Sequence, residues 1–114
     1  MDQSNPFGFK IIEEKEKHRI VFYMVGPDQR YNGREYILKK EKMNEFCEAL
    51  LENYELYLKE KTKGTLNSIS GKMGMTIRFG LIEGICFGGI YGQIRSEKKL
   101  MECISYIKEI KKII

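Results

Sequence analysis

Few residues of this chain have side chains that commonly do covalent or acid–base chemistry. His18 is the only histidine, and it lies in or beside a charged turn that begins at Glu14. The three cysteines are Cys47, Cys86 and Cys103, and no two of them have CxxC spacing. A histidine base and a cysteine nucleophile each need partners in a pocket. Since the layout brings neither a thiol nor metal ligands to His18, we expect no catalytic residue, no cofactor and no metal.

Two glycine-containing stretches resemble sites that hold a phosphate or a nucleotide. The loop Gly64–Lys72 ends in Ser-Gly-Lys, but it lacks the GxxxxGK[ST] spacing and precedes a predicted strand, whereas a P-loop precedes a helix. Gly88–Gly92 follows no βαβ pattern, so it is not a dinucleotide fingerprint. The sequence therefore shows no enzyme signature, and we interpret the protein as non-enzymatic.

Length and composition indicate one soluble α+β domain over residues 1–114, with residues 1–6 as a flexible tail. Hydrophobic residues make up 42% of the chain and charged residues 32%, and the formal net charge is only +4. An odd number of cysteines favours reduced thiols in a cytoplasmic protein over a disulfide framework. The run Phe79–Ile94 has little charge, but Glu83 and several glycines interrupt it, so we expect strands and no membrane span.

Alternation of apolar residues with a period of two predicts three strands ahead of the first helix. These strands cover about residues 7–13, 19–25 and 34–38. Turn signals at Gly26-Pro27-Asp28 and at Asn32-Gly33 separate the second strand from the third. Both faces of the second strand are apolar, which is typical of a strand in the centre of a sheet.

The stretch Met73–Arg95 holds six of the eleven glycines. Alternation there predicts one strand that ends at Phe79 and a second strand over Ile85–Ile94, with a turn between them. Three glycines would then form a bare row on one face of the second strand. These are Gly84, Gly88 and Gly92. Such a row fits close packing by a neighbouring helix or strand, and the alternative is a groove for a ligand.

Apolar residues at three- and four-residue spacing predict two helices. The first begins near residues 40–44 and ends near Lys61, and the second follows Ser96, which suits an N-cap. The apolar stripe predicted for the second helix consists of Leu100, Cys103, Ile104, Ile107, Ile110 and Ile114. The resulting element order is β-β-β-α-β-β-α. We therefore predict an α+β fold, a two-layer sandwich in which two helices cover one face of an antiparallel sheet of about five strands.

The outer side of the first helix carries a stripe of glutamates, an arrangement that costs an isolated helix some repulsion. The stripe consists of Glu41, Glu45, Glu48, Glu52 and Glu55. Arg30, Tyr31 and Arg34 form a second group, of residue types that often anchor protein interfaces. A solvated helix face would also explain the stripe. The functional hypothesis is that these residues dock on a protein partner with a basic surface and occlude it.

Positive charge collects later in the chain, where Arg95–Ile114 carries six basic and three acidic side chains. The residues that could contact a phosphate backbone are Arg95, Lys98, Lys99, Lys108 and Lys112. They support an alternative function as a nucleic-acid-binding module that uses the last helix. No recognised nucleic-acid motif accompanies them.

In size and in the order of its elements, the chain resembles small bacterial toxin-immunity proteins and phage-encoded inhibitors of host defence. The likeness is one of architecture and size, so it assigns no site residues. It implies a small cytoplasmic protein that neutralises a protein partner by covering it. We rank this function first, nucleic-acid binding second, and a small-ligand site or enzyme at the glycine-rich hairpin third.

Overall fold

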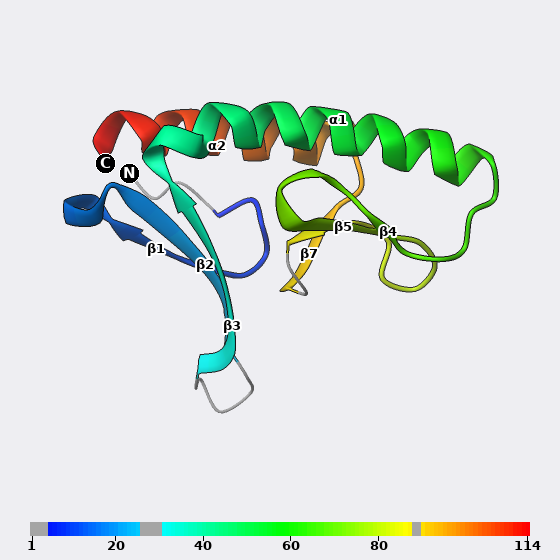
Figure 1. Ribbon diagram of the computed structural model, residues 1–114, viewed down its shortest axis with the longest axis horizontal. Helices are drawn as coiled ribbons and strands as arrows, with labels where there is room; N and C mark the ends of the chain where they lie inside the picture. Colours follow the sequence, from blue (N-terminus) through cyan, green and yellow to red (C-terminus); the bar gives the residue numbers. More distant parts are fainter. Residues whose placement is uncertain (1–4, 26–30, 88–89) are drawn as a thin grey trace.

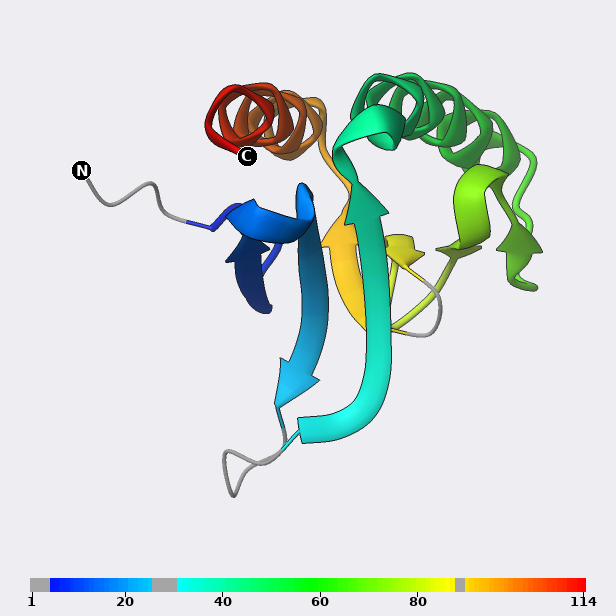
Figure 2. The ribbon, with the colours of Figure 1, turned by 60° about the vertical axis from the view of Figure 1, so that its left-hand side comes forward.

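The computed structural model describes residues 5–25, 31–87 and 90–114. Helices α1 (Met43–Thr62) and α2 (Glu97–Ile113) pack side by side and lie on one side of the strands (Figures 1 and 2). The mixed α+β class predicted from the sequence is therefore confirmed. No helix in the described part of the chain is long and apolar enough to cross a membrane.

The first sheet has three antiparallel strands in chain order. They are β1 (Lys10–Glu14), β2 (Arg19–Val25) and β3 (Tyr31–Lys39). β2 is the central strand, as its two apolar faces predict. The short η1 turn (Lys15–Lys17) joins β1 to β2, and His18 closes it in the left-handed conformation with a φ of 52°. β1 begins at Lys10 and not at Phe7, and β3 begins earlier than predicted.

The second sheet has four short antiparallel strands. They are β4 (Ile69–Ser70), β5 (Met75–Arg78), β6 (Gly84–Phe87) and β7 (Ile90–Ile94). The single strand predicted over Ile85–Ile94 is therefore wrong, because β6 and β7 pair with each other as antiparallel neighbours. The prediction failed because one long strand and two short ones show the same apolar alternation. The η3 turn (Lys72–Gly74) precedes β5.

The structure explains why one residue of the predicted glycine row, Gly84, has to be glycine. It opens β6 with a φ of 123°, and a Cβ there would lie 2.8 Å from the Ile94 carbonyl oxygen. The close neighbour is thus β7, which agrees with tight packing by an adjacent strand and leaves no ligand groove over this residue. Gly92 lies in β7, so the two glycines do not share one strand, and Gly88 lies outside the described residues.

The predicted single sheet of about five strands is wrong, since seven strands of the described chain form two sheets. β7 approaches β2 and β3, but no hydrogen-bonded ladder joins the sheets within the described ranges. The division into two sheets could not be predicted from the sequence, because strand order depends on which strand edges meet in space.

Both helices bury the apolar stripes that the sequence predicts. The η2 turn (Lys40–Lys42) leads into α1, which buries residues such as Phe46 and Leu50. Ser96 caps α2 as expected, since the Lys99 N–H donates a 3.2 Å hydrogen bond to Ser96 Oγ. The buried residues of α2 are Leu100, Cys103, Ile104, Tyr106, Ile107 and Ile110. All of them except Tyr106 belong to the predicted stripe.

Aromatic rings fill the space where the two sheets meet α1. The ring centroid of Phe22, in β2, lies 5.5 Å from that of Phe87, in β6, and 6.1 Å from that of Phe46, in α1. Phe46 and Phe87 lie 5.4 Å apart, and Tyr36 of β3 contacts all three rings. Aromatic pairs at such separations stabilise a core beyond the area that they bury. This ring cluster (Phe22, Tyr36, Phe46 and Phe87) therefore joins both sheets to α1.

Asn53 is the one buried polar side chain among the described residues. Its amide bonds the backbone of Lys72 in both directions, since Nδ2 donates to the carbonyl over 3.2 Å and Oδ1 accepts from the N–H over 2.9 Å. A Cβ at Gly71 would lie 2.7 Å from Asn53 Oδ1, so only glycine leaves room there. These bonds hold the loop before β5 against α1.

Phe87→Ala should lower the free energy of unfolding by about 3 to 5 kcal/mol, because it leaves a cavity in the ring cluster. Urea denaturation followed by circular dichroism measures the change. Leu81→Ala is the control, since the Leu81 side chain is fully exposed. Its loss should change the stability by less than about 0.5 kcal/mol. Equal losses in the two variants would show that the ring cluster does not hold the fold together.

Candidate binding surfaces

The structure exposes the histidine and buries the cysteines. His18 is exposed beside the η1 turn, whereas Cys47, Cys86 and Cys103 are buried and not joined in disulfides. Burial raises the pKa of the Cys47 thiol, and it raises the pKa of Cys103 to about 12. A cysteine nucleophile needs a lowered pKa, so these two thiols are suited to packing. No group of three potential metal ligands gathers in the part of the chain that the structure describes.

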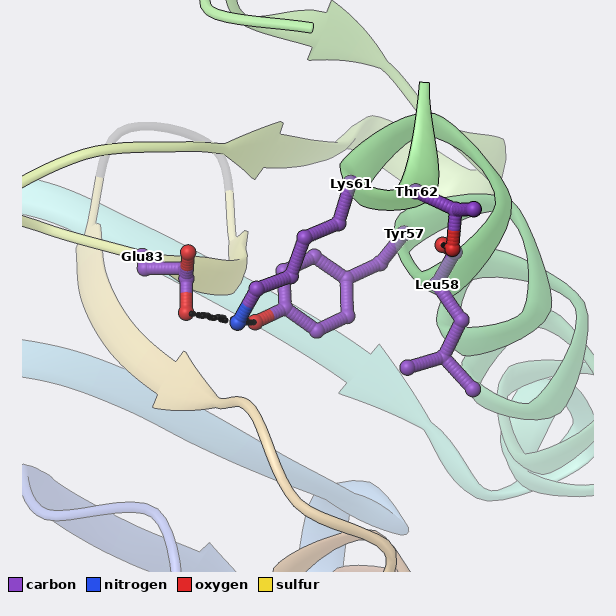
Figure 3. Close-up of polar contacts among 5 residues, drawn as sticks. All are labelled: Tyr57, Leu58, Lys61, Thr62 and Glu83. Atoms are coloured by element: carbon purple, nitrogen blue, oxygen red, sulfur yellow. Dashed lines mark hydrogen bonds and ion pairs between the residues drawn. The ribbon is translucent and has the colours of Figure 1, made fainter. Parts of the chain in front are cut away.

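A polar cluster near the end of α1 holds the loop between β5 and β6 (Figure 3). The Tyr57 hydroxyl donates a 2.7 Å hydrogen bond to Glu83 Oε2, and Lys61 Nζ lies 2.8 Å from the same oxygen. Spacing of four places Tyr57 and Lys61 on one face of α1, from which both reach Glu83. Phe79 stacks on the Tyr57 ring at 5.8 Å between centroids, and Tyr57 is buried.

The hydrogen bonds of this cluster favour its charged carboxylate. Lys61 and Tyr57 lower the pKa of Glu83, and the bond to Glu83 raises the pKa of Lys61. Burial, together with the bond to Glu83, raises the pKa of Tyr57. A tyrosine that accepts a proton in catalysis needs a lowered pKa instead. The cluster is therefore best described as a clamp between α1 and the β5–β6 loop.

The structure divides the predicted glutamate stripe. The glutamates exposed on α1 are Glu45, Glu48, Glu52 and Glu55. Glu41 precedes them in η2 and lies among lysines. Glu52 forms an ion pair with Lys72, and Glu45 lies 3.6 Å from Lys42. These two pairs offset part of the repulsion expected along the stripe.

Two leucines stand within the glutamate stripe, and the apolar periodicity did not single them out. Leu51 and Leu58 are 44% and 45% exposed. Leu51 lies three residues after Glu48, and Leu58 lies three residues after Glu55. This spacing places both leucines in line with the glutamates. We name this surface the acidic face, and it consists of Glu48, Leu51, Glu52, Glu55 and Leu58. Apolar side chains with a charged rim are typical of a surface that binds another protein.

The second predicted group does not join the acidic face. Arg30 lies outside the described residues, and the backbone of Tyr31 and Arg34 belongs to the start of β3. β3 meets the first helix at its other end, near Lys39, so these residues lie away from α1 (Figure 1). Their part in binding stays a prediction.

Lysines from separate segments gather at one end of the molecule, where η1, η2 and the end of α2 lie together (left side of Figure 1). We name this the lysine surface, and its basic members are Lys17, His18, Lys39, Lys40, Lys108, Lys111 and Lys112. They line two adjoining hollows of about 530 and 520 Å³, which share Lys40 and Lys111. The acidic residues in the described lining are Glu41 and Glu109, and Glu109 lies 3.1 Å from Lys112.

Of the five residues predicted to contact nucleic acid, two belong to the lysine surface. Lys108 and Lys112 line the second hollow, whereas Arg95, Lys98 and Lys99 lie at the opposite end of α2. A helix rises about 1.5 Å per residue, so roughly 20 Å separates Lys98 from Lys112. Membership of one helix therefore does not place these residues on one surface.

Tertiary contacts assemble the lysine surface from residues that are distant in the sequence. Strand pairing brings the start of η2 beside the β1–β2 turn, where the Lys40 N–H donates a 2.8 Å hydrogen bond to the His18 carbonyl. Packing of α2 against α1 then adds Lys111. The only local signal for Lys17 and Lys40 is an ordinary charged turn, so the sequence reasoning missed them.

Comparisons with protein-family models, with curated proteins and with solved structures gave no match to the chain. A function therefore has to follow from the chemistry of the surfaces themselves. Among the described residues, the acidic face and the lysine surface each offer a ligand a distinct combination of shape and charge.

Glu83→Gln should lower the urea midpoint at neutral pH, because it removes the carboxylate that Lys61 and Tyr57 bind. The pKa of Glu83 lies below its ordinary value of 4.5, so its contribution is present above that value and is lost as the pH falls through the lowered pKa. The stability difference between wild type and variant should therefore shrink between about pH 6 and about pH 3. Glu55→Gln, at an exposed position, is the control. A difference that stays constant down to acid pH would contradict the clamp.

Proposed function

We propose that this protein is a non-enzymatic binding protein whose lysine surface holds the phosphate backbone of a nucleic acid. The observation that carries the proposal is a concave arrangement of six lysines from η1, η2, α2 and the end of β3, together with His18, which follows η1. Lysines held close together repel one another, and an anion placed between them relieves that repulsion. Release of counterions from the nucleic acid would add to the affinity.

The lining of the two hollows favours nucleic acid over an acidic protein as the ligand. The residues described there include no tryptophan, tyrosine or arginine, and these are the residues that most often anchor protein interfaces. The second hollow also contains Asn44 and Ser105, and amide and hydroxyl groups commonly bond phosphate oxygens. Because the hollows share Lys40 and Lys111, one backbone could follow both.

The acidic face supports a second candidate function, the occlusion of a protein partner that has a basic surface. Leu51 and Leu58 stand nearly half exposed among glutamates. A partner that covered them would gain free energy from apolar burial. Glu48 and Glu55 would add electrostatic attraction and so speed association. A cytoplasmic immunity protein or phage inhibitor would act in this way, without any catalytic group.

Replacing Lys108 and Lys112 by glutamine should weaken binding to a labelled DNA duplex and to a labelled single strand. Each lost phosphate contact should reduce the slope of log K against log salt by about 0.9 for the duplex and about 0.7 for the single strand. Fluorescence anisotropy between about 50 and 200 mM salt measures this slope. The control is Lys98→Gln with Lys99→Gln, which removes the same charge from the other end of α2.

Other results would contradict the nucleic-acid proposal. Equal losses in the two double variants would show that binding follows net charge and not the lysine surface. Absence of binding to either probe at about 50 mM salt would exclude nucleic acid as the ligand. Polyglutamate that bound as tightly as DNA of equal charge would point to an acidic protein instead.

Glu48→Lys with Glu55→Lys should reduce the recovery of partner proteins from the native host at least about tenfold, since losing central contacts costs on the order of 2 kcal/mol. These two glutamates are preferred to Glu52 because Glu52 is paired with Lys72. Quantitative mass spectrometry of pull-downs measures the recovery. A matched variant with both Glu97 and Glu102 changed to lysine alters the charge of α2 equally. If all three proteins recover the same partners, the acidic face is not the binding site.

A further inference from the structure

Strand pairing arranges the first sheet in rows of three residues that point alternately to its two faces. The inner rows contain core residues such as Ile20, Phe22 and Leu38. The outer rows are Lys10 with Tyr23 and Glu35, Ile12 with Val21 and Ile37, and Glu14 with Arg19 and Lys39. On the outer face, an apolar row therefore lies between two charged rows.

The apolar row is only partly covered within the chain. Ile12 and Ile37 are 46% and 44% exposed, and between them Val21 is only 5% exposed. β-Branched side chains pack well on a pleated surface. Sheets stack face to face about 10 Å apart with interdigitated side chains, so a second apolar row laid on this one would cover both isoleucines.

We propose that the outer face of the first sheet is a self-association surface, and that its occupant is a second copy of this chain. The corners of the face carry alternating charge, which makes the face complementary to itself. With a two-fold axis along the isoleucine row, each strand lies over its own copy and the charged rows change places. Lys10 then faces Glu14 of the second copy, and Glu35 faces Lys39 of the second copy.

Two axes in the plane of the face would bring opposite corner charges together, one along the isoleucine row and one along β2. The residues in the middle of the charged rows favour the axis along the isoleucine row. With the axis along the isoleucine row, Arg19 faces the Tyr23 ring of the second copy, and a guanidinium attracts an aromatic face. With the axis along β2, the corner charges would still be opposite, but Arg19 would face Arg19. Within the chain, Arg19 Nε already donates a 2.5 Å hydrogen bond to Glu14 Oε2, which holds this row in place.

The outer face is small, and its size sets the expected strength of the contact. Strands about 4.8 Å apart with a rise of about 3.4 Å per residue give a patch of roughly 14 by 17 Å. A face of that size is smaller than the interfaces of stable complexes, so the contact is expected to be weak and transient. We therefore expect a dimer that forms reversibly and only at high protein concentration, on the order of 100 µM or above, where the free energy of association is only about −5 kcal/mol.

Sedimentation velocity of the full chain from about 10 µM to about 1 mM tests the proposal. The sedimentation coefficient of the wild type should rise with concentration toward that of a dimer. Ile37→Glu should weaken the dimer at least about tenfold, because it places a charge opposite its own copy in the apolar row. Met101→Glu is the matched control, since Met101 is 49% exposed on α2, and this variant should dimerise like the wild type.

Charge exchange between Glu35 and Lys39, which are both exposed, identifies the axis. Glu35→Lys alone and Lys39→Glu alone should each weaken the homodimer, since each sets like charges face to face. A mixture of the two variants should restore the dimer, and so should the double variant. With the axis along β2, position 35 would face Lys10 of the second copy and position 39 would face Glu14 of the second copy. The double variant would then place like charges opposite each other at both positions and stay monomeric.

Several results would overturn the proposal. One is a wild-type chain that remains monomeric at about 1 mM. Another is a dimer that Ile37→Glu leaves intact, because its contact would then lie elsewhere, such as along the free edge of β1. A wild-type dimer that neither the mixture nor the double variant restores would refute the two-fold axis and the charge pairing drawn from it.

Discussion

The two sheets share no hydrogen-bonded ladder within the described residues, so side-chain packing has to hold them together. The ring cluster meets this need, because Phe22 comes from the first sheet, Phe87 from the second and Phe46 from α1. Apolar packing is non-directional and leaves orientation loosely specified. The hydrogen bonds of Asn53 and Tyr57 add direction where α1 meets the loops on either side of β5. The helix ends, the turns and the outer sheet face keep their relative positions only while this packing holds.

The separation of charge on the molecule follows from that packing. α1 exposes glutamates along its outer side, whereas the lysines collect where the start of α1 meets η1 and the end of α2. A concave basic surface suits a ligand whose negative charges are spaced along a flexible chain. An acidic face with exposed leucines suits a partner with an apolar centre and a basic rim. One small domain can therefore present two unlike surfaces.

Elements with one long buried face were predictable, and elements without one were not. The apolar stripe of α2 and the Ser96 cap involve neighbours within one or two turns, so their residues identify them. The stretch Ile85–Ile94 is different, because its alternation suits one strand or two, and only pairing with a partner distinguishes them. The buried role of Asn53 could not be predicted from the sequence for a related reason. A polar residue inside an apolar stripe has no signature until the backbone of Lys72 is placed beside it.

Local pattern was enough to establish the α+β class, the central position of β2 and the buried sides of both helices. These features depend on side chains a few positions apart, whose spacing the chain itself imposes. The division into two sheets, the gathering of Lys17, Lys40 and Lys111, and the charged rows of the outer sheet face needed the folded molecule. They depend on which distant segments touch, and the free energy of those contacts comes from long-range packing and strand register that no short stretch of sequence encodes.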